Sequence, residues 1–268
     1  MKMVSGKAFP LLFLGWASLG ITHAQEAKPR QAPPPPTAAQ VAKSAYWENI
    51  FKTAPGAGPV NANWERWEKY RAQYAKAKTA DQGAVVFLGD SITFHFDLAK
   101  AFPNLKTANR GLSGDTTRGM LYRLPEEVLD LHPKLIVLLC GVNDLSEAKA
   151  GHGGSPEGIA ANIRLMLEKI REKQPQTPVL VCEIMPAGKP GLKEANAAVD
   201  QVVPDFPNAH RLKIHQLFLN PDGRQNKSLF KDGTHPNAAG YAVWQAALAP
   251  EITKWLGSSS ALPPPASK

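Results

Sequence analysis

The sequence has little cysteine, with only Cys140 and Cys182 in 268 residues. Two cysteines cannot build the dense disulfide framework of a small secreted domain, and a chain of this length can bury a hydrophobic core without one. Neither has a second Cys or a His at metal-ligand spacing, so no metal-binding role is assigned to them. Each ends an apolar run typical of a strand. A buried free thiol is favoured there, and a single disulfide between neighbouring strands remains open.

Long apolar runs and blocks of one charge are also missing. Beyond the first 24 residues, no stretch has the length and apolarity of a membrane span, which takes about 20 residues. The formal net charge is +8, but the basic residues alternate with acids, as in Glu65-Arg66 and Glu168-Lys169. They form no basic block and no RNA-binding aromatic motif. The sequence therefore indicates neither nucleic-acid binding nor stable membrane association.

The first residues have the pattern of an export signal. Lys2 and Lys7 come with an apolar segment over 10–21, and Thr22-His23-Ala24 follows as a small-residue cleavage site. The apolar segment is shorter than a spanning helix and contains glycine, which favours a cleaved signal peptide over a retained anchor. We therefore expect a signal peptide over 1–24, cleavage after Ala24, and export to the periplasm or out of the cell.

Composition divides the rest of the chain. Residues 25–44 contain Pro33-Pro34-Pro35-Pro36 and lack apolar periodicity, which predicts a disordered leader. Residues 257–268 are rich in Ser and Pro and are expected to be a flexible tail. The length between them suits one hydrophobic core, so a single domain is predicted over 45–256.

Within that domain, short apolar runs alternate with longer amphipathic segments. Runs without polar alternation are typical of strands covered on both faces. The predicted strands are 84–88, 105–108, 135–139, 179–184 and 211–215, and the predicted helices are 63–78, 117–131, 192–203, 237–255 and one that starts at Pro156 with Ser155 as its N-cap. This pattern predicts a single α/β domain, a three-layer α/β/α structure around a parallel sheet of about five strands. Its ligand site is expected at the carboxyl ends of the strands.

Two sets of side chains at helical spacing are interpreted as packing. One is an apolar stripe in the helix after Pro156; the other is aromatic and lies in the helix over 63–78. The stripe is Ile159, Ile163, Met166, Leu167 and Ile170, and the aromatic set is Trp64, Trp67, Tyr70 and Tyr74. Such spacing is typical of a face turned to the core. For the aromatic set, a platform for sugar rings is the less favoured alternative.

The segment Gly89-Asp90-Ser91 follows the first predicted strand and precedes a predicted helix. A serine in a tight turn from strand to helix can present its hydroxyl, and its own N–H then lies at a helix start, where negative charge is stabilised. By itself the tripeptide is more typical of an ordinary helix N-cap. The nucleophile motif Gly-x-Ser-x-Gly is not matched, because position 93 is Thr.

Two further segments offer hydrogen-bond donors after predicted strands. Gly111, in Asn109–Thr117, permits close backbone approach and can direct an N–H at a tetrahedral oxyanion. Asn143, after the third predicted strand, can supply a side-chain amide to the same oxyanion. Each segment alone also fits an ordinary turn.

Near the C-terminus, Asp232 precedes His235 by three residues. A carboxylate at that distance on one loop can hold the imidazole through one nitrogen, leaving the other to accept a proton from Ser91. His95 is a rival base, but it is expected within the helix after Ser91 and directed away from that residue. The prediction is a catalytic set of Ser91, Asp232 and His235.

Taken in order, these segments resemble the SGNH or GDSL hydrolase superfamily, whose four named residues match Ser91, Gly111, Asn143 and His235 here. The closest resemblance is to the branch with platelet-activating-factor acetylhydrolase catalytic subunits and carbohydrate acetylesterases, through Gly89–Thr93 and Asn109–Thr117. The resemblance spans about 84–256 and implies a flavodoxin-like fold, no metal and no organic cofactor. One departure is Phe94-His95-Phe96, where a Trp is common in this branch, and it bears on the shape of the substrate pocket.

These expectations combine into an exported carboxylic ester hydrolase. Its substrate is expected to be a small ester or an acetylated carbohydrate, cleaved through an acyl-enzyme on Ser91 with an oxyanion hole of Ser91, Gly111 and Asn143. The alternatives are a lysophospholipase or other lipid esterase, an acyltransferase with the same site, and a carbohydrate-binding protein that has lost the reaction. The sequence leaves the oligomeric state open.

Overall fold

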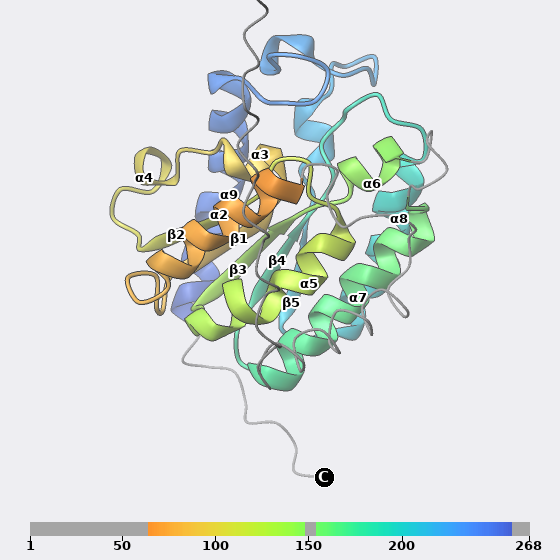
Figure 1. Ribbon diagram of the computed structural model, residues 1–268. Helices are drawn as coiled ribbons and strands as arrows, with labels where there is room; N and C mark the ends of the chain where they lie inside the picture. The colour runs from red at the N-terminus through yellow and green to blue at the C-terminus, as the bar shows by residue number, and fades with distance from the viewer. Residues whose placement is uncertain (1–63, 148–153, 259–268) are drawn as a thin grey trace, which may run out of the picture.

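In the computed structural model, which describes residues 64–147 and 154–258, five parallel strands form one sheet in the order β2-β1-β3-β4-β5 (Figure 1). The strands are β1 (Val85–Gly89), β2 (Thr107–Gly111), β3 (Leu135–Leu139), β4 (Val179–Cys182) and β5 (Ala209–Leu212). All residues of β1 and β3 are buried, because layers of side chains cover both faces of the sheet. The predicted α/β fold with about five parallel strands is confirmed.

The two edge strands differ in position from their predictions. β2 continues past the predicted 105–108 through the polar residues Asn109 and Arg110, which extend the ladder with β1. β5 begins and ends earlier than the predicted 211–215 and contains mostly half-buried side chains. An edge strand has a neighbour on one side only, so its apolar pattern is weaker and its ends are harder to locate from sequence.

Helices cover the sheet on two faces. On one face lie α5 (Thr117–Glu127), α7 (Pro156–Lys173) and α8 (Leu192–Val202), with α2 (Trp64–Ala77) packed on α5. On the other lie α4 (Leu98–Ala101) and α9 (Ala238–Ser258); Figure 1 shows α5 and α7 in front of the sheet and α9 behind it. Right-handed crossovers produce this division, because the chain moves from β1 to β2 in one direction and from β2 to β5 in the other.

Short helices complete the structure. They are α3 (Ser91–Phe94), α6 (Val142–Glu147), and the 3₁₀ helices η1 (Leu129–Leu131), η3 (Val203–Asp205), η4 (His215–Phe218) and η5 (Lys227–Leu229). No helix within the two described ranges has both the length and the apolarity needed to cross a membrane. The predicted signal peptide, the predicted leader and residues 259–268 of the predicted tail lie outside the described residues, and α9 includes 257 and 258.

The predicted start of the helix at Pro156, with Ser155 as its N-cap, is confirmed. The Ser155 hydroxyl accepts a hydrogen bond of 3.0 Å from the Gly158 N–H, and Pro156 is the first residue of α7. Every member of the predicted stripe is at most 2% exposed: Ile159, Ile163, Met166, Leu167 and Ile170. The stripe lies in the hydrophobic core, as its spacing predicts.

The aromatic side chains of α2 pack against the domain. Trp67 is 1% exposed, and its ring lies 5.6 Å from the ring of Tyr122 in α5. Tyr70 contacts Phe94 with 4.8 Å between ring centroids, and the Tyr74 hydroxyl donates to the Gly111 carbonyl. The packing interpretation is confirmed for these three; the side chain of Trp64 lies outside the described part. These contacts place α2 beside the carboxyl end of β2, where the ligand site is predicted.

Cys140 and Cys182 are buried free thiols. Burial raises the pKa of the Cys182 thiol to about 12 and that of the Cys140 thiol well above its ordinary value. Both therefore remain protonated at neutral pH and act as small apolar side chains of the core.

Candidate active site

Ser91, His235 and Asp232 meet at the carboxyl end of the sheet, although 144 residues separate the serine from the histidine. Ser91 begins α3 just after β1, and His235 lies in the segment before α9 (Figure 1). The Ser91 Oγ lies 2.8 Å from His235 Nε2, and His235 Nδ1 lies 2.9 Å from Asp232 Oδ2. Hydrogen bonds thus connect a hydroxyl, an imidazole and a carboxylate, the arrangement that makes a serine nucleophilic.

The loop before α9 holds the Asp232 carboxylate through its own backbone. Asp232 Oδ1 accepts hydrogen bonds of 2.8 Å from the N–H of Thr234 and of 2.8 Å from the N–H of His235. The bond from the His235 backbone, the bond from its ring and the bond from Thr234 lower the pKa of Asp232 to about 2. The carboxylate is therefore ionised at neutral pH and orients the His235 ring through Nδ1, which leaves Nε2 for Ser91.

The turn between β1 and α3 explains why Ser91 is available for chemistry. A Cβ on Gly89 would lie 2.0 Å from Thr93 Oγ1 and 2.7 Å from the Leu139 carbonyl oxygen, so glycine is required where α3 starts so close to the sheet. Asp90 is the N-cap of α3, since its Oδ1 accepts from the Ile92 N–H at 2.9 Å. Because Asp90 caps the helix, the Ser91 hydroxyl is left to contact His235.

Asn143 and the Ser91 backbone offer donors at adjacent strand ends. Asn143 lies in α6, directly after β3, and β3 pairs with β1. Its Nδ2 donates one hydrogen to the Asp115 carbonyl at 2.8 Å, which orients the amide and leaves its second hydrogen available. The Ser91 N–H has no acceptor among the residues that the structure describes. Both donors can therefore bind an oxyanion that forms at Ser91.

The third predicted donor, the N–H of Gly111, is already engaged. It donates a 2.8 Å hydrogen bond to Asn109 Oδ1, which counts against its predicted place in an oxyanion hole. A Cβ on Gly111 would lie 2.1 Å from the Phe94 backbone nitrogen, so this glycine allows α3 to pack on β2. Its structural role is close packing between two elements.

Gly114 is the better candidate for this donor. It lies in the turn after β2 with a φ of +79°, and its N–H has no acceptor within 64–147 or 154–258. The carbonyl of the next residue, Asp115, accepts from the Asn143 amide, so this turn is held beside Asn143. The expected loop over Asn109–Thr117 contains both glycines, and the sequence alone gives no distance that separates Gly114 from Gly111 as the donor.

The expected direction of His95 is also corrected. His95 is the C-cap of α3, and its ring lies 6.1 Å from the His235 ring in an edge-to-face arrangement. It therefore faces the site rather than away from it, because the helix is only one turn long and ends at this residue. The hydroxyl of Ser91 nevertheless bonds to His235, so His95 lines the site beside the base.

A buried arginine that the sequence did not single out joins the segments of the site. The Arg123 guanidinium donates from Nη2 to the Gly89 carbonyl at 2.9 Å and from Nε to Asp115 Oδ2 at 2.7 Å. Its Nη1 donates to Glu127 Oε2 at 2.9 Å, and the side chain is fully buried. Arg123 thus holds the strand that precedes Ser91 against the turn that holds Asn143. No local motif marks it, since its partners come from three segments of the chain.

The chain matches known proteins over this region. Residues 87–243 match the GDSL-like lipase/acylhydrolase family. The alpha2 subunit of platelet-activating factor acetylhydrolase IB from Rattus norvegicus is 30% identical over 189 residues, which cover 66% of this chain and 80% of that protein. The alpha1 subunit from Homo sapiens is 28% identical over 187 residues, which cover 66% of this chain and 78% of that protein.

Solved structures share the fold. A GDSL-like lipase from Bacteroides thetaiotaomicron superposes with a TM-score of 0.60 and 25% identity, covering 72% of this chain and 98% of that chain. An acetyl xylan esterase from Geobacillus stearothermophilus superposes with a TM-score of 0.52 and 19% identity, covering 64% of this chain and 96% of that chain. On the family match and these relatives, the chain belongs to the GDSL-like lipase/acylhydrolase family and is a carboxylic ester hydrolase.

Proposed function

We propose that the protein is an exported serine esterase that removes acetyl groups from carbohydrate through an acyl-enzyme on Ser91. The observation that carries the proposal is the chain of hydrogen bonds from Ser91 through His235 to Asp232. A preference for acetyl is supported by relatives that are named acetylhydrolase and acetyl xylan esterase. The latter name also supports a carbohydrate substrate, and export is supported by the pattern of residues 1–24.

The first half-reaction forms the acyl-enzyme. Ser91 Oγ attacks the carbonyl carbon of the ester while its proton passes to His235 Nε2, and the imidazolium is stabilised by the Asp232 carboxylate. The negative charge that develops on the carbonyl oxygen is bound by the N–H groups of Ser91 and Gly114 and by the Asn143 amide. The bond between the carbonyl carbon and the alcohol oxygen then breaks, and His235 gives its proton to that oxygen.

The second half-reaction returns the enzyme. A water molecule attacks the acetyl carbonyl carbon while His235 Nε2 accepts one of its protons. The same donors bind the second oxyanion. The bond to Ser91 Oγ breaks, His235 returns the proton to Ser91, and acetate leaves.

Labelling with a fluorophosphonate, combined with a profile of acyl length, tests this function. The reagent is expected to form one adduct on Ser91 in the folded protein, and Ser91→Ala is expected to abolish both adduct and hydrolysis. Ser228→Ala is the matched control, because Ser228 is exposed and its hydroxyl bonds to Asn226 rather than to a histidine. Wild-type hydrolysis is expected to be fastest on acetyl esters and to fall for butyryl and longer esters.

Two results would contradict the proposal in different ways. Full esterase activity in Ser91→Ala would exclude the assigned nucleophile and the acyl-enzyme on it. A maximum of activity on long acyl esters, with Ser91 still required, would keep the nucleophile and replace the acetylesterase by a lipid esterase.

The carbohydrate part of the proposal is tested separately. Equal activity on acetylated xylan and on simple acetyl esters would support carbohydrate as a substrate.

A further inference from the structure

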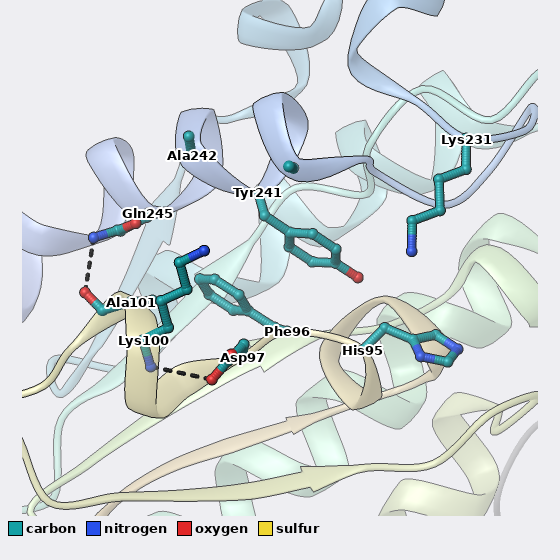
Figure 2. A pocket seen from close by; sticks show the side chains of 10 residues that line it. His95, Phe96, Asp97, Lys100, Ala101, Lys231, Tyr241, Ala242 and Gln245 are labelled. Atoms are coloured by element: carbon teal, nitrogen blue, oxygen red, sulfur yellow. Dashed lines mark hydrogen bonds between the residues drawn. The ribbon is translucent and has the colours of Figure 1, made fainter.

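A cavity of about 510 Å³ opens between α4 and the first turns of α9 (Figure 2). His95 and Lys231, which both contact His235, line one end of it, and Lys100 lines it on the α4 side. Tyr241 and Phe96 also line it. We refer to this cavity as the α4–α9 groove. None of the reaction steps described above uses it.

The α4–α9 groove begins beside His235. The His95 ring, which lines the groove, lies 6.1 Å from the His235 ring. The backbone N–H of Lys231 donates to the His235 carbonyl at 2.8 Å, so this lysine is fixed to the segment that carries the base. In ester hydrolysis the imidazole delivers its proton to the leaving alcohol, which must therefore lie next to it. The groove is thus placed to receive the alcohol part of the ester.

The side walls of the groove are held at a fixed separation. The Gln245 side chain in α9 donates to the Ala101 carbonyl at the end of α4 at 2.7 Å (Figure 2). Phe96 stacks on Tyr241 with 5.1 Å between ring centroids and an interplanar angle of 12°. The Tyr241 hydroxyl donates to the Ile92 carbonyl in α3 at 2.8 Å. Phe96 is buried, so the half-buried Tyr241 ring supplies the aromatic surface of the groove. This ring is tied to the helix that begins with Ser91, and such a surface suits the apolar face of a sugar ring.

The charges on the groove are mainly positive. Lys100 and Lys231 line it together with one acid, Asp97, whose Oδ1 accepts from the Lys100 backbone N–H. Neither lysine forms an ion pair with a residue of 64–147 or 154–258, whereas Lys78 and Lys213 do. Figure 2 shows the Lys231 side chain extending from the loop before α9 toward His95 and the Tyr241 hydroxyl. Both ammonium groups can therefore pair with a ligand.

We propose that the α4–α9 groove binds the alcohol part of the ester and that Lys100 and Lys231 select an alcohol that carries a negative charge. The inference rests on the proposed esterase function and specifies its substrate. The anion is a carboxylate of an acidic sugar or a phosphate on the alcohol, since both accept hydrogen bonds from an ammonium group. The aromatic surface supports a sugar ring that carries a carboxylate as the first case to test.

Matched acetate esters test the charge selection directly. The first pair is an O-acetylated methyl glucuronoside and its neutral uronamide, and the second pair is acetylglycerol phosphate and acetylglycerol. The quantity measured is kcat/KM for the charged ester divided by kcat/KM for its neutral partner, which cancels any effect common to both. For wild type we expect a ratio of about 10 in at least one pair, typical of a charge-assisted hydrogen bond. The pair that shows it identifies the anion.

Substitutions then connect the ratio to the two lysines. Lys231→Gln and Lys100→Gln are each expected to lower it severalfold, and added salt is expected to lower it in wild type because exposed charges are screened. Lys193→Gln is the control, since Lys193 is an exposed lysine of α8 on the opposite face of the sheet and is expected to keep the wild-type ratio.

Two results would overturn the inference. One is a wild-type ratio near one in both pairs, and the other is a ratio that neither lysine substitution changes. Either result, with the neutral esters still hydrolysed through Ser91, leaves the proposed function intact. If wild type hydrolyses none of the four esters, the proposed function fails and this inference fails with it.

Discussion

At the scale of single residues, one hydrogen of the Asn143 amide is bonded to the Asp115 carbonyl, and the second is available to an oxyanion. Because Asp115 holds the amide at 2.8 Å, its free hydrogen can meet an oxyanion without reorganisation. Asn143→Ala is expected to lower kcat for an acetyl ester by about 100- to 1,000-fold. KM is expected to change much less, because the lost bond forms mainly in the transition state. Steady-state kinetics would show this, and a loss below about tenfold would remove Asn143 from the oxyanion hole.

The buried carboxyl of Asp90 makes the stability of the fold depend on pH. Burial raises the pKa of its carboxyl from 3.8 to about 7, and only Oδ1 has a partner, the Ile92 N–H, among the described residues. The folded protein therefore keeps a proton that the unfolded chain loses, so this group makes folding less favourable as pH rises from about 4 to about 7. Asparagine cannot ionise and can still cap α3.

The Asp90→Asn variant is therefore expected to gain stability relative to wild type with rising pH. Urea unfolding at about pH 4 and about pH 8 would measure the two free energies of unfolding. The difference between variant and wild type is expected to grow by about 1.4 kcal/mol for each unit by which folding raises the pKa. An equal difference at both pH values would show that folding does not raise the pKa of the Asp90 carboxyl.

At the scale of secondary-structure elements, the packing of α3 on β2 depends on Gly111. An alanine there would place a Cβ 2.1 Å from the Phe94 nitrogen and force α3 off the strand. Gly111→Ala is expected to destabilise the fold by about 1–3 kcal/mol or more and to reduce activity, because Ser91 moves with α3. Gly233→Ala is the control for stability, since a Cβ on Gly233 would have no atom within 4 Å outside its chain neighbours. Thermal unfolding of both variants measures the effect. A melting temperature of Gly111→Ala equal to that of Gly233→Ala would contradict the packing role of Gly111.

The elements also show why sequence reasoning located some parts of the fold better than others. β3 matches its predicted limits because a central strand is apolar throughout, and α7 matches because Ser155 and Pro156 mark its start. β2 was placed too early, since its residues are partly polar and not all of them are buried. In the site, the predicted donor Gly111 is the last residue of β2, and Gly114 lies in the turn that follows.

At the scale of the whole molecule, we predict that the exported chain begins at Gln25. The segment 1–24 has the charge and apolar pattern of a signal peptide, with small residues at the cleavage site. Expression of the full chain in a bacterium, followed by N-terminal sequencing of periplasmic and secreted protein, would test this. Ala24→Arg is the control, because a large charged residue at that position is expected to block cleavage. Protein that keeps Met1 and stays in the cytoplasm would contradict the prediction.

The sequence by itself determined the class of fold and marked Ser91, Asp232 and His235 as candidate catalytic residues. Apolar periodicity and local spacing are properties of neighbouring residues, so both can be recognised without the structure. Only the tertiary structure decided which groups meet. It placed His235 on Ser91 across 144 residues, engaged the Gly111 N–H with Asn109, and directed His95 toward the site. It also buried Arg123 between separate segments and formed the α4–α9 groove. These features depend on distances between elements, which hydrophobic packing sets and which no local pattern encodes.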